Sequence, residues 1–118
     1  MNDFARRIRP FVSRELTAAW RSPDPATRIA HLERAHVLGQ ASTREHVRAH
    51  LHMLACAWRR GDVHDVAGQL LRVLGAAAFT GVGMVPAGNT GGANVSAFQR
   101  MAIPPDLTRL IAWARRRR

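Results

Sequence analysis

The sequence predicts an all-α protein of four to five helices in antiparallel hairpins, an irregular helical bundle. Three observations lead to this fold class. Apolar residues recur at intervals of three and four over several long stretches, helix-starting and helix-ending residues separate these stretches, and no two segments pair as strands. The chain of 118 residues suits a single helical domain over 1–118, and an apolar fraction of 47% is enough to build a core.

The first two helices are predicted from their apolar spacing and their caps. The first should run from Asp3 to Trp20, and Pro10 inside it either kinks the helix or marks its true start. Asp24 has the chemistry of an N-cap and precedes a second helix that should stop at Gly39. One face of the first helix carries the apolar residues Phe4, Ile8, Phe11, Val12, Leu16 and Ala19.

The third and fourth helices have equally clear start signals. Ser42 and Glu45 form a capping box, with a serine at the cap and a glutamate three residues on, and the third helix should end at Gly61. Asp62 should cap a fourth helix that extends to about Thr80. This fourth helix is expected to bury Val63, Val66, Leu70, Val73, Leu74 and Ala77.

Short connections between these helices predict antiparallel hairpins. Only Gly39 to Ala41 separate the second helix from the third, and Gly61 separates the third from the fourth. The small residues Ala26 and Ala30 make the first two helices loosely tetratricopeptide-like, although the tryptophan and tyrosine landmarks of that repeat are missing.

The remainder of the chain holds a glycine-rich loop, a short helix and a basic tail. The loop at 81–104 includes Asn89 and Asn94 and could offer backbone amides to an anion, although it matches no phosphate-binding motif. A last helix is expected from Asp106 to Trp113, followed by the arginine-rich tail at 115–118.

The net charge of +10 is a weak indicator of polyanion binding. All 18 basic residues are arginine, and lysine and tyrosine are absent, which is the bias of a GC-rich genome. We therefore expect any nucleic-acid binding to be weak, non-specific and salt-sensitive. No apolar stretch reaches the ~18–20 residues of a membrane span, and no signal peptide is evident. A single cysteine, Cys56, suits a reducing cytoplasm, where we expect the protein to reside.

Four polar residues are predicted to converge across the second hairpin. Glu33 and His36 are three residues apart, and His46 and His50 are four apart, so each pair shares one helix face. In an antiparallel hairpin that turns near residue 41, His36 lies level with His46 and Glu33 with His50. The two pairs should therefore face each other in adjacent layers.

Three imidazoles and one carboxylate in this arrangement suit a divalent metal ion such as zinc, iron, manganese, cobalt or nickel. Glu15, Gln40 and Met53 are accessory candidates, since each lies close to the predicted site face. The alternative is a buried polar network without metal, in which the four residues bond one another or nearby arginines. The remaining histidines, His31, His52 and His64, are expected at the surface.

Two blocks of the sequence carry a resemblance to a known family. Residues 32–40, LERAHVLGQ, and residues 88–95, GNTGGANV, resemble a small bacterial family of unknown function and of about this length. The resemblance implies that Gln40 belongs with Glu33 and the three histidines. It also implies a bacterial protein without an export signal.

The leading functional interpretation is a cytoplasmic protein that binds a divalent transition metal, with metal handling as a process that it could serve. Four protein ligands would close a tetrahedral site, which favours a non-enzymatic role over a small metalloenzyme with an open position for water. A nucleic-acid-binding protein and a tetratricopeptide-like interaction module without metal are the two remaining interpretations. A protein partner or a homodimer is compatible with each.

Overall fold

The computed structural model describes residues 2–79 and 101–116, and these residues form five α-helices and no strand. The helices are α1 (Asp3–Arg21), α2 (Pro25–Gly39), α3 (Thr43–Arg60), α4 (Val63–Phe79) and α5 (Pro105–Arg115). The all-α prediction is confirmed. The expected helix end at Thr80, the loop residues Asn89 and Asn94, and Arg117 and Arg118 of the basic tail lie outside the described residues.

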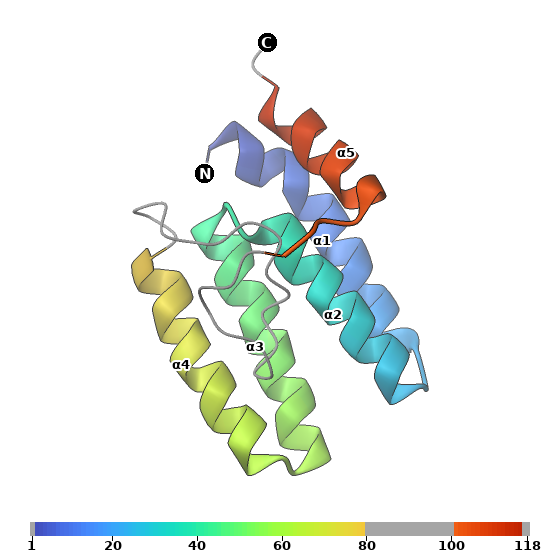
Figure 1. Ribbon diagram of the computed structural model, residues 1–118, viewed down its shortest axis with the longest axis vertical. Helices are drawn as coiled ribbons and strands as arrows, with labels where there is room; N and C mark the ends of the chain where they lie inside the picture. Colours follow the sequence, from blue (N-terminus) through green and yellow to red (C-terminus); the bar gives the residue numbers. More distant parts are fainter. Residues whose placement is uncertain (1, 80–100, 117–118) are drawn as a thin grey trace.

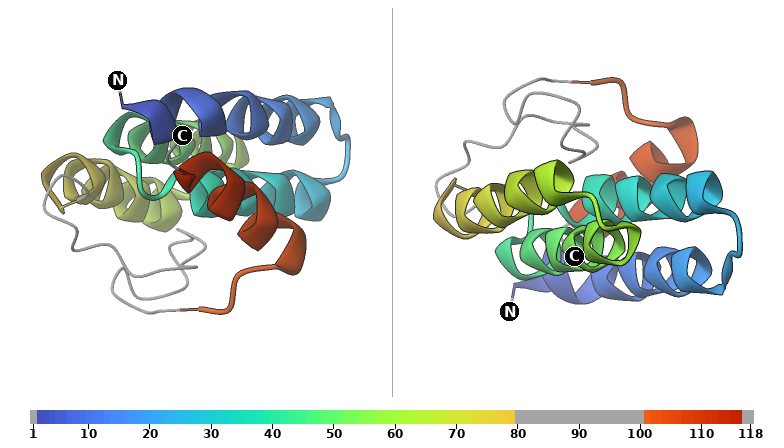
Figure 2. Two further views of the ribbon diagram at one scale, coloured as in Figure 1. Left: turned by 90° about the horizontal axis from the view of Figure 1, so that it is seen from above. Right: turned by 90° about the horizontal axis from the view of Figure 1, so that it is seen from below.

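The helices from α1 to α4 run antiparallel to one another in turn, as the short connections predicted (Figure 1). α1 packs along α2, α2 against α3, and α3 along α4, while α5 lies across α1 and α2. Figure 2 shows α4 at the edge of the molecule, away from α1 and α5. Among the described helices, α4 contacts only α3.

The helix ends follow the local signals in the sequence. The Asp24 carboxylate accepts a hydrogen bond from the Thr27 amide at 3.0 Å, and Asp62 accepts one from the Asp65 amide at 3.0 Å. Gly61 has a φ of 69°, the left-handed conformation that closes α3 and favours glycine. Pro10 lies on the exposed side of α1, and the helix continues through it.

The capping box and the role of Gly39 differ from the sequence prediction. Ser42 accepts from the Glu45 amide at 3.4 Å, but the Ser42 amide already donates to the Gly39 carbonyl at 2.9 Å. The Glu45 side chain is therefore not drawn back to the cap; it is fully buried and pairs with Arg48 at 3.1 Å. Gly39 is the last residue of α2, and Gln40 after it remains right-handed.

Gly39 is needed for a close approach between two helices. A Cβ atom placed on Gly39 would lie 2.8 Å from the Cβ of Glu45, well inside van der Waals contact. The absence of a side chain on α2 thus allows the first turn of α3 to pack directly against it. His36 precedes Gly39 by three residues and His46 directly follows Glu45, so both histidines lie close to this contact.

The apolar core lies between α1, α2, α3 and α5. Its buried members are Ile8, Val12, Leu16, Ala19, Leu32, Ala35, Val37, Leu38, Met53, Cys56, Leu107 and Ala114. The predicted apolar face of the first helix contributes to it as expected.

The predicted buried face of the fourth helix is wrong. Val63, Leu70, Leu74 and Ala77 are exposed, and Val66 and Val73 are half-buried. The buried residues are instead Gln69 and Ala76. The reason is that α4 turns a mixed polar and small-residue side toward α3 and leaves its most apolar side open.

We predict that Gly39→Ala destabilises the fold by about 1–3 kcal/mol, because the new methyl group would overpack the contact with Glu45. The sign of the change in the free energy of unfolding is diagnostic, because replacing glycine by alanine in an unconstrained helix stabilises the protein by up to ~1 kcal/mol. Urea unfolding of the two proteins measures the difference. An unchanged or increased stability would contradict the proposed close approach.

Candidate metal centre

Three buried histidines meet between α2 and α3. His36 comes from the last turn of α2, and His46 and His50 come from successive turns of α3. The Nε2 atom of His36 lies 2.9 Å from that of His46 and 3.1 Å from that of His50, and the last two lie 3.2 Å apart. The three nitrogens therefore form one nearly equilateral triangle, not the two layers expected from the hairpin register.

This triangle cannot be satisfied by hydrogen bonds among the three nitrogens alone. Each Nε2 either carries a proton and donates or lacks one and accepts. With three nitrogens and two states, at least two are alike, and they lie 2.9–3.2 Å apart. Two lone pairs or two N–H groups then face each other at hydrogen-bonding distance, an unfavourable contact in a buried site.

Gln69 of α4 fixes the proton on one of the rings. Its Oε1 atom lies 2.8 Å from Nδ1 of His50, and because an amide oxygen only accepts, His50 Nδ1 is the donor. The neutral His50 ring consequently presents an unprotonated Nε2 to the centre of the triangle. A second residue that orients a ring in this way is characteristic of histidine ligands in metal sites.

Burial also holds the imidazoles in their neutral form. Desolvation, with a smaller contribution from His50, lowers the pKa of His46 from 6.5 to about 3. Desolvation likewise lowers the pKa of His50 to about 4, against the opposing effect of its bond to Gln69, and nearby Arg72 adds to the decrease. Neutral imidazole is the form that binds metal ions.

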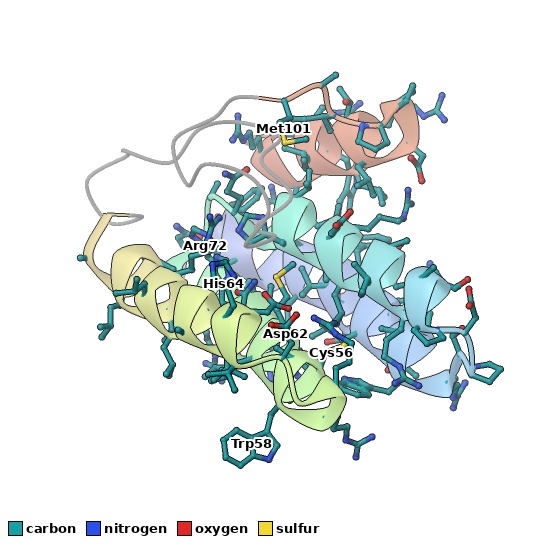
Figure 3. All side chains as sticks on the ribbon, turned by 60° about the horizontal axis from the view of Figure 1, so that its bottom comes forward. Cys56, Trp58, Asp62, His64, Arg72 and Met101 are labelled. Carbon is teal, nitrogen blue, oxygen red and sulfur yellow. The ribbon has the colours of Figure 1, made fainter. Side chains whose placement is uncertain are left out.

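A cavity of about 370 Å³ is lined by Gln69, the partner of His50, while the three histidines themselves are not among its lining residues. Glu33, one turn before His36 on α2, lines this cavity and is half-buried, which raises the pKa of its carboxyl. Of the four predicted ligands, only the three histidines bring their ligand atoms within 4.8 Å of one another, and Glu33 lies outside this group. Within the described residues, Glu33 makes no hydrogen bond or ion pair. The other lining residues are Ile29, Leu32, Met53, Cys56, Arg60, Asp62, His64, Asp65 and Gln69. Three of them, Cys56, Asp62 and His64, are labelled in Figure 3.

A family model described as a protein of unknown function (DUF3703) matches residues 6–111. The chain belongs to this family. No curated protein and no solved structure matches it. The description of this family assigns no activity.

The accessory residues predicted for this DUF3703 chain lie at different distances from the triangle. Met53 is buried one turn after His50 and lines the cavity, and Gln40 is buried at the C-cap of α2. Glu15 points elsewhere, because its two oxygens bond His31 Nδ1 at 2.7 Å and Arg34 Nε at 3.0 Å.

Two of the histidines outside the triangle are less exposed than predicted. His31 is half-buried beside Glu15, and His52 is half-buried and accepts a hydrogen bond from Trp20 Nε1 at 2.8 Å. Each connects its helix to α1, because a histidine at the edge of a core finds a polar partner there. His64 is exposed as expected, and it stands at the cavity.

Gln69 is the one residue of the site that was not predicted from the sequence. The feature of the sequence that could have indicated it is a single amide side chain among the apolar residues of the fourth helix, three residues after Val66 and four before Val73. A buried amide on a helix face needs a partner, and a histidine on the neighbouring helix supplies one.

No helix within the described residues is both long and apolar enough to cross a membrane, in agreement with the sequence expectation.

We predict that the metal-free protein loses stability as the pH falls from about 6.5 to 4. The pKa values of His46 and His50 are about 3 and 4 in the folded state and 6.5 in the reference state, so the unfolded chain takes up protons first. The contribution is complete above pH 6.5 and decreases by roughly 1 kcal/mol per pH unit for each additional proton that the unfolded chain binds.

Urea unfolding in the presence of a chelator, repeated across this pH range, measures the slope. The doubly substituted protein His46→Gln/His50→Gln should have a distinctly flatter profile. An equally steep profile in this variant would mean that other groups cause the pH dependence.

Proposed function

We propose that this protein binds one divalent transition-metal ion through the Nε2 atoms of His36, His46 and His50. The observation that supports this most directly is the triangle of three buried nitrogens 2.9–3.2 Å apart. A cation at the triangle would accept three lone pairs at once and remove the conflict between like nitrogens.

The size of the triangle agrees with such an ion. Zinc–imidazole bonds are ~2.0–2.1 Å long, so an ion equidistant from three nitrogens at this spacing lies about 1 Å out of their plane. It therefore keeps at least one coordination position on its open side. Imidazole ligands suit zinc, iron, cobalt and nickel, and a carboxylate as fourth ligand extends the set to manganese.

Glu33 is the proposed fourth ligand. It shares a helix with His36, its carboxyl is half-buried, and it lines the cavity beside the site. An adjacent cation would favour the ionised carboxylate and offset the cost of its burial. With Glu33 bound, a tetrahedral site is closed by four protein ligands, and we therefore favour a role in metal binding or handling without catalysis.

The charge of the cavity supports the approach of a cation. Three carboxylates, Glu33, Asp62 and Asp65, line it, although the chain has only eight acidic residues and a net charge of +10. Arg60, also at the cavity, is paired with Asp65. Local negative potential of this kind concentrates cations at a site.

A small metalloenzyme is the second candidate, and the cavity is the observation that favours it. If Glu33 stays off the metal, one coordination position is left for water, and the nearby cavity of about 370 Å³, which Gln69 lines, has room for a small substrate. The two candidates share the histidine ligands and differ only in the fourth position.

We predict about one metal ion per chain when the protein, prepared without an affinity tag, is stripped and refilled separately with zinc, iron(II), manganese, cobalt and nickel. His36→Ala, His46→Ala and His50→Ala should each abolish stoichiometric binding, because two nitrogens alone hold a metal weakly. Elemental analysis after gel filtration measures the metal content.

Matched controls are the histidines outside the triangle. His31→Ala and His64→Ala should retain one ion per chain, since neither ring contributes to the three-nitrogen group. Circular dichroism must show all variants folded. A wild-type protein that takes up none of the five metals would disprove the proposal, as would equal loss in the controls.

We further predict that Gln69→Leu weakens metal affinity about 10–100-fold while leaving one site per chain. The substitution removes the acceptor that fixes the His50 proton on Nδ1 but leaves all three ligands in place. Competition with a chromogenic chelator measures the affinity, and an unaltered affinity would remove Gln69 from the site.

Glu33→Gln separates the two functional candidates. In the cobalt(II)-loaded protein, the visible spectrum should change if Glu33 is a ligand, because a charged oxygen donor is replaced. An unchanged spectrum, together with an exchangeable water on the metal, would favour the metalloenzyme.

A further inference from the structure

α4 has its polar and apolar sides reversed relative to an ordinary surface helix. Successive residues of a helix are ~100° apart, so Asp65, Gln69 and Arg72 lie on one side and face α3 and the cavity. The opposite side carries no charged residue. Its largest side chains are exposed: Val63 by 80%, Leu71 by 71% and Leu74 by 69%.

α3, the neighbour of α4, also carries exposed apolar residues. Trp58, 75% exposed, projects from the last turns of α3 away from the rest of the molecule (Figure 3). In the same figure Arg72 lies on the side of α4 turned toward the molecule. We call this surface the outer face; it consists of Leu51 and Trp58 of α3 and Val63, Leu70, Leu71 and Leu74 of α4.

The area of the outer face is that of a protein–protein interface. At their exposed fractions its six side chains present on the order of 700 Å², above the ~300–600 Å² of the largest apolar patch on a typical monomer. A standard interface buries ~800 Å² from each partner. The outer face alone therefore comes close to the area that one subunit of a stable dimer contributes.

We propose that the outer face is the interface of a homodimer, in which α4 of one chain packs against α4 of a second copy. Two chains that each carry a net charge of +10 repel at most approaches. The uncharged side of α4 is where they can meet without placing arginines opposite one another. A second copy also supplies an apolar surface of matching size, as an interface between identical patches requires.

The arrangement follows from the symmetry of such a contact. A two-fold axis near Leu70 and Leu71, the middle of the stripe, places the two α4 helices antiparallel. α3 and α4 of one chain then stack face to face on α3 and α4 of the other, so that Leu51 and Trp58 are covered together with the apolar side of α4. The Trp58 end of one chain lies beside the far end of the partner's α4.

Binding to a lipid surface fits the outer face less well. Helices that lie on membranes carry several lysines or arginines beside their apolar stripe to meet the headgroups. The only arginine of α4 is Arg72, which is half-buried and on the opposite side, and the exposed arginines on the side of Leu51, which are Arg44 and Arg59, belong to α3.

The mass of the untagged protein in solution, measured by light scattering after gel filtration from micromolar to submillimolar concentration, tests the proposal. We expect twice the 13.1 kDa chain mass for the wild type. Leu71→Glu/Leu74→Glu should weaken association at least ~100-fold and give the single-chain mass, because burying four carboxylates per dimer is prohibitive. Thr17→Glu/Ala30→Glu, with the same charge change at exposed positions of α1 and α2, should remain dimeric.

A cysteine pair tests the orientation. In a Cys56→Ala background, Leu71→Cys should form an intermolecular disulfide, and Val63→Cys should not, because antiparallel packing places the two copies of position 63 about 24 Å apart. The reverse result would overturn the antiparallel arrangement. A wild-type protein that is monomeric at all concentrations would overturn the dimer proposal. A monomeric wild-type protein that floats with phosphatidylglycerol vesicles in a density gradient would show that the outer face binds a membrane instead. The metal-free variant His46→Ala should still dimerise, so this outcome is independent of the metal proposal.

Discussion

The close approach of α2 and α3 at Gly39 determines the geometry of the site. A side chain at this position would begin 2.8 Å from the Cβ atom of Glu45, so only glycine lets the two helices pack at this spacing. His36 precedes Gly39 by three residues, and His46 directly follows Glu45. The contact thus sets how far apart the two helix backbones lie at the level where the imidazoles meet. A wider spacing would remove His36 from the 2.9 Å range of His46.

Other parts of the fold support the triangle indirectly. The apolar core between α1, α2, α3 and α5 orients α2 and α3 relative to each other. The partner for His50 comes from α4, through Gln69. Since α4 contacts only α3 among the described helices, the proton position of one candidate ligand depends on the packing of a single helix pair.

The helices and most of their caps could be predicted because those signals are local in sequence. Asp24, Asp62 and Gly61 act through neighbours within a few residues, and the structure agrees with each. The meeting of His36 with His46 was also accessible, since a short antiparallel turn fixes which residues are level. The convergence of all three rings in one triangle was not, because it depends on how side chains extend across the gap between helices.

The face of the fourth helix could not be predicted, and the error is informative. Apolar periodicity locates the hydrophobic side of a helix but does not identify what covers it, and the usual assumption is the core of the same chain. Here the core side of α4 is defined by Gln69 and Ala76, while the leucines face outward. Glu45 is a second example. A capping box predicts that its side chain accepts a hydrogen bond from the Ser42 amide, but that amide donates to the Gly39 carbonyl instead.

The reversal of α4 connects the two proposals made for this protein. One side of the helix brings Gln69 to His50 and Asp65 to the cavity, and the other side presents the leucines of the outer face. A helix that packs on a single neighbour through small and polar residues gains little apolar burial from that contact. Its most apolar side is then the main unused source of stabilisation, and a second copy of the chain would supply it. The two proposals therefore draw on opposite sides of the same helix.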